Sequence, residues 1–153
     1  MTRSIIAAVV LVATTVTALA QDAPYCPDLK QINNLAMTRE RFAPIIGTPR
    51  VGNYRNTSLP LTGWTDCSFY GQATYTCDSQ ALKTVEDARL AQARVKQEIL
   101  RCLAGAWADA PEQSGPDFVV LHPKLGPASI TLSLDEADNK EHIVRITIFL
   151  RRS

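Results

Sequence analysis

The sequence has 153 residues, with 16 basic and 15 acidic side chains and a formal net charge of +1 at pH 7. So small a charge creates no global electrostatic field, which argues against nucleic acid or an anionic membrane as the main partner. The length suits one domain with a hydrophobic core of its own.

The first 20 residues have the pattern of a secretory signal peptide. Arg3 precedes the apolar run 5–13, and small residues end the segment at Ala18 and Ala20. The run is shorter than the roughly 20 apolar residues that a membrane-spanning helix needs. We therefore predict cleavage after Ala20, which leaves residues 21–153 as a single periplasmic or secreted domain without a membrane span.

Two helices are expected near the start of this domain. The first covers residues 28–36, where apolar side chains recur at helical spacing and Asp28 can cap the N-terminus. A second, short helix begins near Thr38 and stops at Gly47. The prolines, glycines and asparagines of residues 48–63 then predict a long loop.

The middle of the chain predicts a hairpin followed by a long helix. Residues 64–70 and 73–77 are rich in strand-forming side chains and are separated by a short turn. Thr84, with an acid three residues later, predicts the start of the helix, and Gly105 predicts its end. Apolar side chains recur along one side of this helix, whereas Leu90 falls on its polar side.

Three strands are expected in the last third. Residues 118–121 are apolar and β-branched, and residues 130–134 and 144–150 alternate between apolar and polar side chains. A period of two is typical of strands with one buried face. The outward side chains of the last two strands suit a solvent face or a wet protein-binding face. They are Ser129, Thr131, Ser133, Arg145, Thr147, Phe149 and Arg151.

The order of these elements predicts an α+β fold. We expect an antiparallel sheet of about five strands, with one long helix and one or two short helices packed on one face. The loop 135–141, which is rich in acids, connects the last two strands. It lacks the spacing and the glycine of a calcium-binding EF-hand loop, so we expect a solvated loop.

The cysteines Cys26, Cys67, Cys77 and Cys102 predict two disulfides, since an even number in an exported chain is typical of paired thiols. A strand running out and a helix running back would bring Cys77 beside Cys102. We therefore favour Cys77–Cys102 with Cys26–Cys67. The alternative, Cys67–Cys77 with Cys26–Cys102, places one bridge across the hairpin, where disulfide geometry is harder to satisfy.

Residues that could support catalysis are few. The chain contains no nucleophile elbow, no phosphate-binding glycine loop and no zinc-protease motif, and its cysteines lack the spacing of a metal site. We predict no cofactor and no metal. His122 and His142 are the two histidines, each at the end of a predicted strand, and a general acid–base pair is the catalytic role open to them.

Residues 37–49 form the run Met-Thr-Arg-Glu-Arg-Phe-Ala-Pro-Ile-Ile-Gly-Thr-Pro, which precedes a strand containing Trp64. This run resembles a segment of the small lipoprotein subunit of the outer-membrane barrel-assembly machinery and of the related β-lactamase-inhibitor proteins. Those families are exported modules that bind proteins and catalyse no reaction. The resemblance implies a binding module. This chain differs in having no lipid-accepting cysteine and in its long helix between the hairpin and the last strands.

Two hypotheses for the function follow. The first is a small exported disulfide-containing protein without catalytic activity, which binds another protein or an envelope component. Export, small size, balanced charge and missing catalytic motifs favour it. The second is a small exported hydrolase that uses His122 and His142. It requires both histidines to lie in one cleft with carboxylates.

Overall fold

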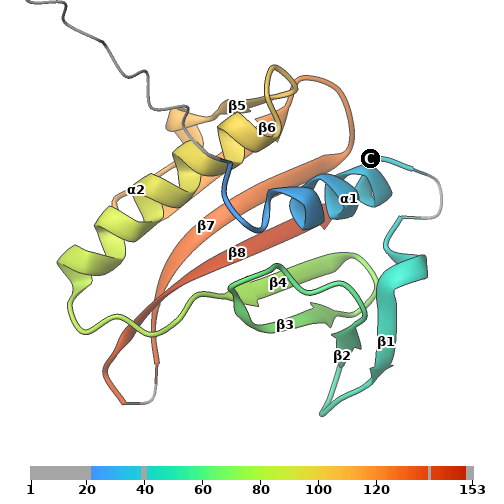
Figure 1. Ribbon diagram of the computed structural model, residues 1–153, viewed down its shortest axis with the longest axis horizontal. Coiled ribbons are helices and arrows are strands. Elements are labelled where there is room, and N and C mark those ends of the chain that lie inside the picture. Colours follow the sequence, from blue (N-terminus) through green and yellow to red (C-terminus); the bar gives the residue numbers. More distant parts are fainter. Residues whose placement is uncertain (1–21, 39–40, 138, 151–153) are drawn as a thin grey trace, which may run out of the picture.

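The computed structural model describes residues 22–38, 41–137 and 139–150 (Figure 1). The leader and the predicted cleavage site after Ala20 lie outside these residues. The helices are α1 (Cys26–Ala36), α2 (Val85–Cys102) and the 3-10 helices η1 (Ala43–Ile45) and η2 (Pro111–Gln113). The strands are β1 (Ile46–Pro49), β2 (Tyr54–Thr57), β3 (Thr65–Tyr70), β4 (Thr74–Asp78), β5 (Trp107–Asp109), β6 (Phe118–Pro123), β7 (Ala128–Glu136) and β8 (His142–Leu150).

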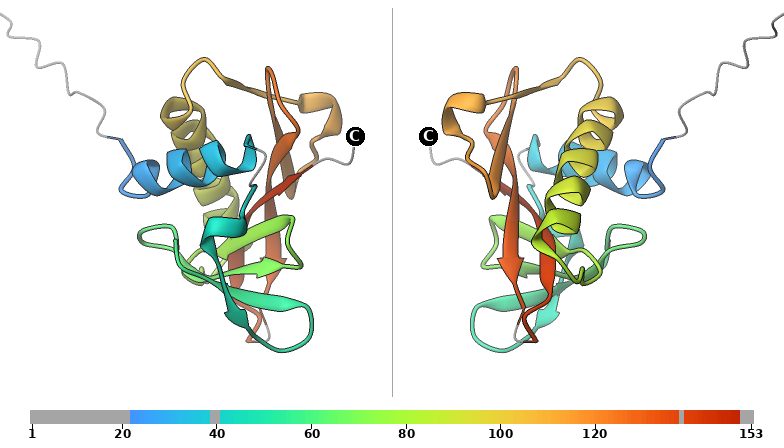
Figure 2. Two further views of the ribbon diagram at one scale, coloured as in Figure 1. Left: turned by 90° about the vertical axis from the view of Figure 1, so that its right-hand side faces the viewer. Right: turned by 90° about the vertical axis from the view of Figure 1, so that its left-hand side faces the viewer.

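The strands form one antiparallel sheet in the order β1-β2-β3-β4-β8-β7-β6-β5. This confirms the α+β class and the antiparallel sheet. The sheet of the described residues has eight strands, so the expected number of about five was too low. The pairing of β4 with β8 joins an N-terminal meander to a C-terminal one, and both α-helices lie on one side of β7 and β8 (Figure 2).

The three strands missing from the sequence prediction are short. β1 and β2 lie within the predicted loop 48–63 or at its border, and β5 has only three residues. β1 and β2 have four residues each and include Pro49 and Asn56, which are uncommon in strands. Strands this short show too little alternation of apolar and polar side chains to be recognised in the sequence. Their partners in the sheet supply the backbone hydrogen bonds that define them, and partners distant in sequence cannot be inferred from local propensity.

Helix α2 begins as the sequence predicts. The Thr84 hydroxyl accepts a hydrogen bond from the backbone N–H of Asp87 at 3.1 Å and donates to its carboxylate at 2.8 Å. This exchange satisfies one of the N–H groups that a helix start leaves free. Leu90 is 72% exposed, as its position on the polar side implies. No helix in the described part of the chain has the length and apolar character that crossing a membrane requires.

Helix α1 starts two residues earlier than expected, at Cys26, and Asp28 does not cap it. The Asp28 carboxylate instead accepts hydrogen bonds from the backbone N–H and the hydroxyl of Thr62, at 2.8 and 2.7 Å. Asp28 thus ties the loop before β3 to the first turn of α1. The short helix expected after Thr38 is reduced to the three residues of η1.

The hydrophobic core fills the space between the helices and the sheet. Phe42, Phe69 and Tyr75 form an aromatic cluster with ring centroids 5.2 to 6.5 Å apart. All three are fully buried, and the Tyr75 hydroxyl donates to the Leu59 carbonyl at 2.9 Å. Isoleucines and leucines of β7 and β8 extend this core beneath α2, namely Ile130, Leu132, Ile146 and Ile148.

The disulfides are Cys26–Cys102 and Cys67–Cys77, with Cα atoms 5.5 and 4.0 Å apart. The structure therefore has the alternative pairing in place of the favoured Cys77–Cys102 and Cys26–Cys67. Cys67 lies opposite Cys77 because it continues the register in which Ser68 pairs with Thr76, and the register then shifts before Thr65, which pairs with Asp78. Such a bulge places two residues of one strand opposite one residue of its partner.

The length of α2 explains why Cys77 does not meet Cys102. Cys77 pairs with Ile146 of β8. In the connection between β4 and α2, Leu82 forms an isolated β-bridge with His142 at the start of β8. These positions on β8 span about 13 Å, whereas the 18 residues of α2 rise about 27 Å. The helix therefore runs well past Cys77, and Cys102 reaches Cys26 at the start of α1.

Candidate functional site

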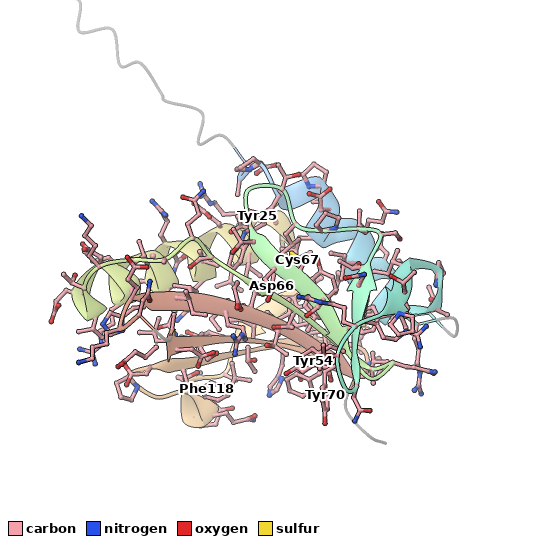
Figure 3. All side chains as sticks on the ribbon, turned by 90° about the horizontal axis from the view of Figure 1, so that it is seen from below. Tyr25, Tyr54, Asp66, Cys67, Tyr70 and Phe118 are labelled. Carbon is pink, nitrogen blue, oxygen red and sulfur yellow. A yellow bond between two sulfur atoms is a disulfide. The ribbon has the colours of Figure 1, made fainter. Side chains whose placement is uncertain are left out.

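The sheet has two different faces. Side chains alternate along each strand, so one set lies under the helices and the other points to the opposite side. We call this opposite side, as formed by β2, β3, β4, β8 and β7, the open face. Figure 3 separates the two sides, with Tyr25 among the helices and Tyr54, Tyr70 and Phe118 on the other side. The open face therefore offers side chains that the core does not use.

A row of hydroxyl groups crosses the centre of the open face. Ser68 pairs with Thr76, Thr76 with Thr147, and Thr147 with Thr131, on β3, β4, β8 and β7 in turn. Directly paired residues of an antiparallel sheet share one face. The Thr76 and Thr147 hydroxyl oxygens lie 3.4 Å apart. We call these four residues the hydroxyl row.

Charged side chains run along one side of the hydroxyl row. Arg145 donates to both carboxylate oxygens of Asp78, at 2.6 and 3.0 Å, and lies 2.6 Å from an Asp135 oxygen. The hydrogen bond to Asp78 raises the pKa of Arg145. A second pair joins Arg50 to Asp66 at 2.7 Å. These contacts hold the guanidinium and carboxylate groups in place before any ligand arrives.

Two tyrosines lie on the other side of the hydroxyl row. Tyr54 and Tyr70 are paired residues of β2 and β3, with ring centroids 5.4 Å apart in an edge-to-face arrangement. They are 48% and 51% exposed, and Val51 beside them is 90% exposed. Large half-exposed rings held by a partner ring are well suited to contact a ligand.

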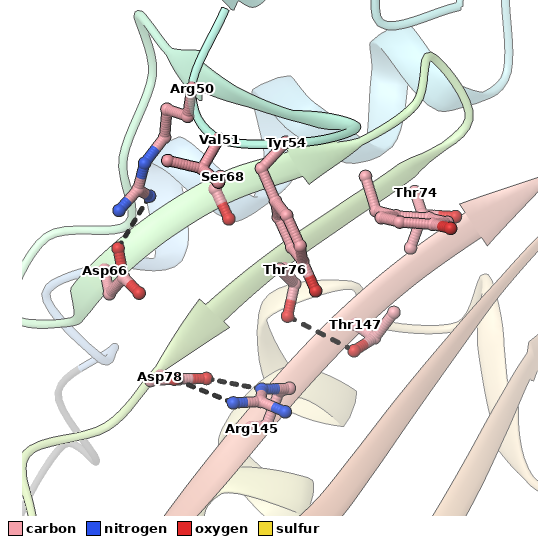
Figure 4. Close-up of a pocket in the computed structure, with 11 residues that line it drawn as sticks. Arg50, Val51, Tyr54, Asp66, Ser68, Thr74, Thr76, Asp78, Arg145 and Thr147 are labelled. Carbon is pink, nitrogen blue, oxygen red and sulfur yellow. Dashed lines mark hydrogen bonds and ion pairs between the residues drawn. The ribbon is translucent and has the colours of Figure 1, made fainter.

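Side chains from each of these three sets line a groove of about 680 Å³ (Figure 4). Its floor is the polar sheet surface and its upper wall is the turn between β1 and β2, which carries Arg50 and Val51. The other lining residues are Tyr54, Asp66, Ser68, Tyr70, Thr74, Thr76, Asp78, Arg145 and Thr147. The groove has the size of a ligand-binding site.

His122 has a structural role at the far end of the open face. Its Nδ1 lies 3.0 Å from the Ser129 hydroxyl and its Nε2 lies 2.8 Å from the Gln113 side-chain oxygen. Ser129 is fully buried. The histidine thus ties η2 to β6 and β7, and η2 covers this end of the face.

His142 lies at the opposite end of the sheet. It pairs with Glu136 on β7, seven positions from the Ser129 that contacts His122. Seven positions along a strand correspond to about 24 Å. In the register of β8, His142 also shares the covered side with Val144. The structure therefore does not bring the two histidines together, and their geometry gives no support to the hydrolase hypothesis.

The acidic loop is divided between two local roles. Asp135 joins the Arg145 network, while Glu141 accepts from the Asn139 amide at 2.5 Å and its own N–H donates to Asn139 at 3.1 Å. Among the described residues, no three His, Cys, Asp or Glu side chains are grouped so that they could hold a metal ion.

A second cavity, of about 450 Å³, lies on the covered side between the start of the domain and α2. Tyr25 donates to Glu98 at 2.7 Å and packs edge to face on Trp64, with centroids 5.8 Å apart. Burial and the hydrogen bond to Glu98 raise the pKa of the Tyr25 phenol. These contacts fasten the N-terminal segment to α2.

No protein-family model, no curated protein and no solved structure matches this chain. The local resemblance at residues 37–49 therefore finds no support at the level of a family. In the structure, residues 43–49 of this segment form η1 and β1, and Phe42 and Ile45 are buried.

The sequence pattern predicts half of the open face. The alternation in residues 130–134 and 144–150 indicated which side chains of β7 and β8 point outward. Ser129 is nevertheless fully buried, against His122, and Arg151 lies outside the described residues. The pattern missed the half formed by β2, β3 and β4, including Tyr54 and Tyr70. The alternation of Thr74 and Thr76 with Tyr75 and Cys77 is the signal that could have revealed it.

Proposed function

We propose that this protein is an exported binding module without catalytic activity, and that the open face is its binding surface. The observation that carries the proposal is the groove of about 680 Å³, whose charged and aromatic side chains are fixed by contacts within the protein. The bound molecule is another protein or an envelope component.

Export is supported by the cysteines and by the leader. Both disulfides are formed, and no cysteine is free. Structural disulfides persist in oxidising compartments such as the periplasm or the extracellular space. The leader pattern at residues 1–20 agrees with this location, and cleavage after Ala20 is part of the proposal.

The other surfaces of the sheet are less available for binding. One face is covered by α1 and α2, and the strands at the two edges, β1 and β5, have four and three residues. Short edge strands, and a proline such as Pro49 in β1, hinder the addition of a further strand from a partner. The open face remains as the large surface on which a partner can dock.

The side chains in the groove also suit recognition. Tyrosine and arginine contribute strongly to binding energy at protein surfaces, and the groove holds two of each but neither lysine nor glutamate. Tyr54 packs edge to face on Tyr70, and Arg50 and Arg145 form ion pairs with aspartates. Side chains that are already ordered lose less conformational entropy on binding.

Site-specific crosslinking in the native host tests the binding surface. A photoreactive phenylalanine derivative replaces Tyr70 on the open face or, as the matched control, Leu90 on the exposed side of α2. We expect adducts from position 70 and none from position 90. Tyr54→Ala with Tyr70→Ala should also abolish copurification of the bound component, while Leu90→Ala retains it. Adducts formed equally from both positions, or none from position 70, would refute the open face as the binding surface.

Export is tested separately on the protein recovered from its host. N-terminal sequencing should begin at Gln21, and titration with a thiol reagent under denaturing conditions should find no free thiol. A protein that retains Met1 and has four reactive thiols contradicts export.

A further inference from the structure

We propose that the open face binds an extended, neutral 1,4-linked oligosaccharide that runs across the strands along the hydroxyl row. This inference rests on the proposed function and names the chemistry of its ligand. The envelope component of the proposed function is then a glycan.

The distribution of polar groups favours a glycan over a protein surface. Protein interfaces have an apolar centre and a polar rim. Here the order is reversed, because the partly exposed Thr76 and Thr147 form the centre while Tyr54 and Val51 lie at the side. A polar centre requires a ligand that offers hydrogen bonds along its whole length. Sugar hydroxyls, which both donate and accept, meet that requirement.

The spacing of the hydroxyl row suits a repeating chain. Its four members lie on four neighbouring strands, each paired directly with the next. Ser68 is buried, so Thr76, Thr147 and Thr131 are the members of the row that a ligand can reach. Neighbouring strands are about 4.8 Å apart, so these three hydroxyls follow one another over about 10 Å. Each residue of an extended 1,4-linked pyranose chain advances by a similar distance. Successive sugars can therefore meet successive threonines.

The two sides of the row complement the two kinds of surface on a sugar ring. Tyr70 and Tyr54 offer half-exposed rings to the apolar C–H faces of the pyranose. On the other side, Asp66 and Asp135 keep exposed carboxylate oxygens, with side chains 61% and 35% exposed, and these can accept from sugar hydroxyls.

The charges of the groove favour a neutral chain over an acidic one. Arg50 is neutralised by Asp66, and Arg145 lies between Asp78 and Asp135. Three carboxylates against two guanidinium groups leave a slight excess of negative charge. An anionic polymer would be repelled and would find no unpaired arginine among these groups.

Nuclear magnetic resonance titration of the isotope-labelled full chain tests the inference with cellohexaose and chitohexaose as probes. We expect shifts at the hydroxyl row and at Tyr54 and Tyr70 with at least one probe. Tyr70→Ala and the nearly isosteric Thr147→Val should each weaken binding about tenfold. The control Leu90→Ala should bind as the unaltered protein does. Maltohexaose, whose chain is curved, should bind more weakly than the extended probes.

The outcomes separate this inference from the proposed function. If neither extended probe binds while position 70 still crosslinks to a protein, the proposal of a glycan ligand is refuted, and the proposal that the open face is the binding surface is retained. If both probes bind Thr147→Val and Tyr70→Ala as tightly as the control, the glycan site is also wrong. Shifts centred on α2 around Leu90 would overturn both proposals. Thermal melting of each variant establishes that a loss of binding is not a loss of the fold.

Discussion

Adjacent residues of β8 belong to different environments. Ile146 and Ile148 are fully buried under the helices, whereas Arg145 and Thr147 face the groove on the other side of the same strand. The first pair contacts a core that both helices complete. The second pair contacts polar side chains of β4 and β7, namely Asp78, Thr76 and Asp135. One strand thus serves the core and the candidate site through alternate residues.

This difference separates the stability of the protein from its recognition surface. Burial of an isoleucine side chain stabilises a fold by about 1.5–3 kcal/mol, whereas exposed polar substitutions usually change stability by about 0.5 kcal/mol or less. The open face can therefore carry a specific arrangement of side chains at little cost to folding. Both disulfides lie with the covered side, since Cys77 and Cys26 are buried there.

The largest expected effect concerns the disulfide that joins α1 to α2. Cys26→Ser with Cys102→Ser opens a link between residues 76 positions apart, and the chain-entropy relation gives a loss of about 4.5 kcal/mol in the free energy of unfolding. Cys67→Ser with Cys77→Ser opens a link of only 10 positions, for which the same relation gives about 2.7 kcal/mol. Urea denaturation of both variants measures the two losses. A larger loss for the hairpin bridge would contradict this ranking.

The second prediction uses neighbours on the two faces. Ile148→Ala should lower the free energy of unfolding by about 3 kcal/mol, because it leaves a cavity among fully buried side chains. Thr147→Val should change it by about 0.5 kcal/mol or less, because this side chain is only partly buried. Urea denaturation again provides the measurement. Equal losses would mean that the open face is covered in solution, for example by a second copy of the chain.

The sequence predicts those parts of the covered side that depend on local pattern. Thr84 caps α2 because a hydroxyl three residues before an acid is a local signal, and β7 and β8 alternate because each has one buried face. The disulfide pairing depends instead on how far α2 runs relative to β8. Strand order decides that distance, and no local pattern encodes the pairing of β4 with β8.

The candidate site is harder to predict for the same reason. Thr76 and Thr147 are 71 positions apart in sequence and become neighbours only when β4 pairs with β8. The groove exists because this pairing joins two meanders whose outward sides are both polar. Sequence alternation can identify each half, but only the assembled sheet shows that Tyr70 and Arg145 line the same groove.

The smallest expected effect is a pH dependence of the stability that arises from two tyrosines on the covered side. Burial raises the pKa of Tyr25, as does its hydrogen bond to Glu98, and burial raises the pKa of Tyr75. Above pH 10 the unfolded chain therefore releases phenol protons that the folded chain retains. Stability that is complete below pH 10 should then decline as the pH rises, by up to about 1.4 kcal/mol per pH unit for each of the two tyrosines.

Tyr25→Phe tests this decline directly. At neutral pH the variant loses the hydrogen bond to Glu98 and about 1 kcal/mol of stability. Above pH 10 its stability should fall less steeply than that of the unaltered protein, because one of the two retained protons is gone. Urea midpoints between pH 9 and pH 11 give the slopes, with Leu90→Ala as a control that keeps the original slope. If Tyr25→Phe also keeps the original slope, the phenol of Tyr25 ionises in the folded protein as readily as in the unfolded chain. The contact between the N-terminal segment and α2 would then be open to water, and the covered side would be less closed than its core implies.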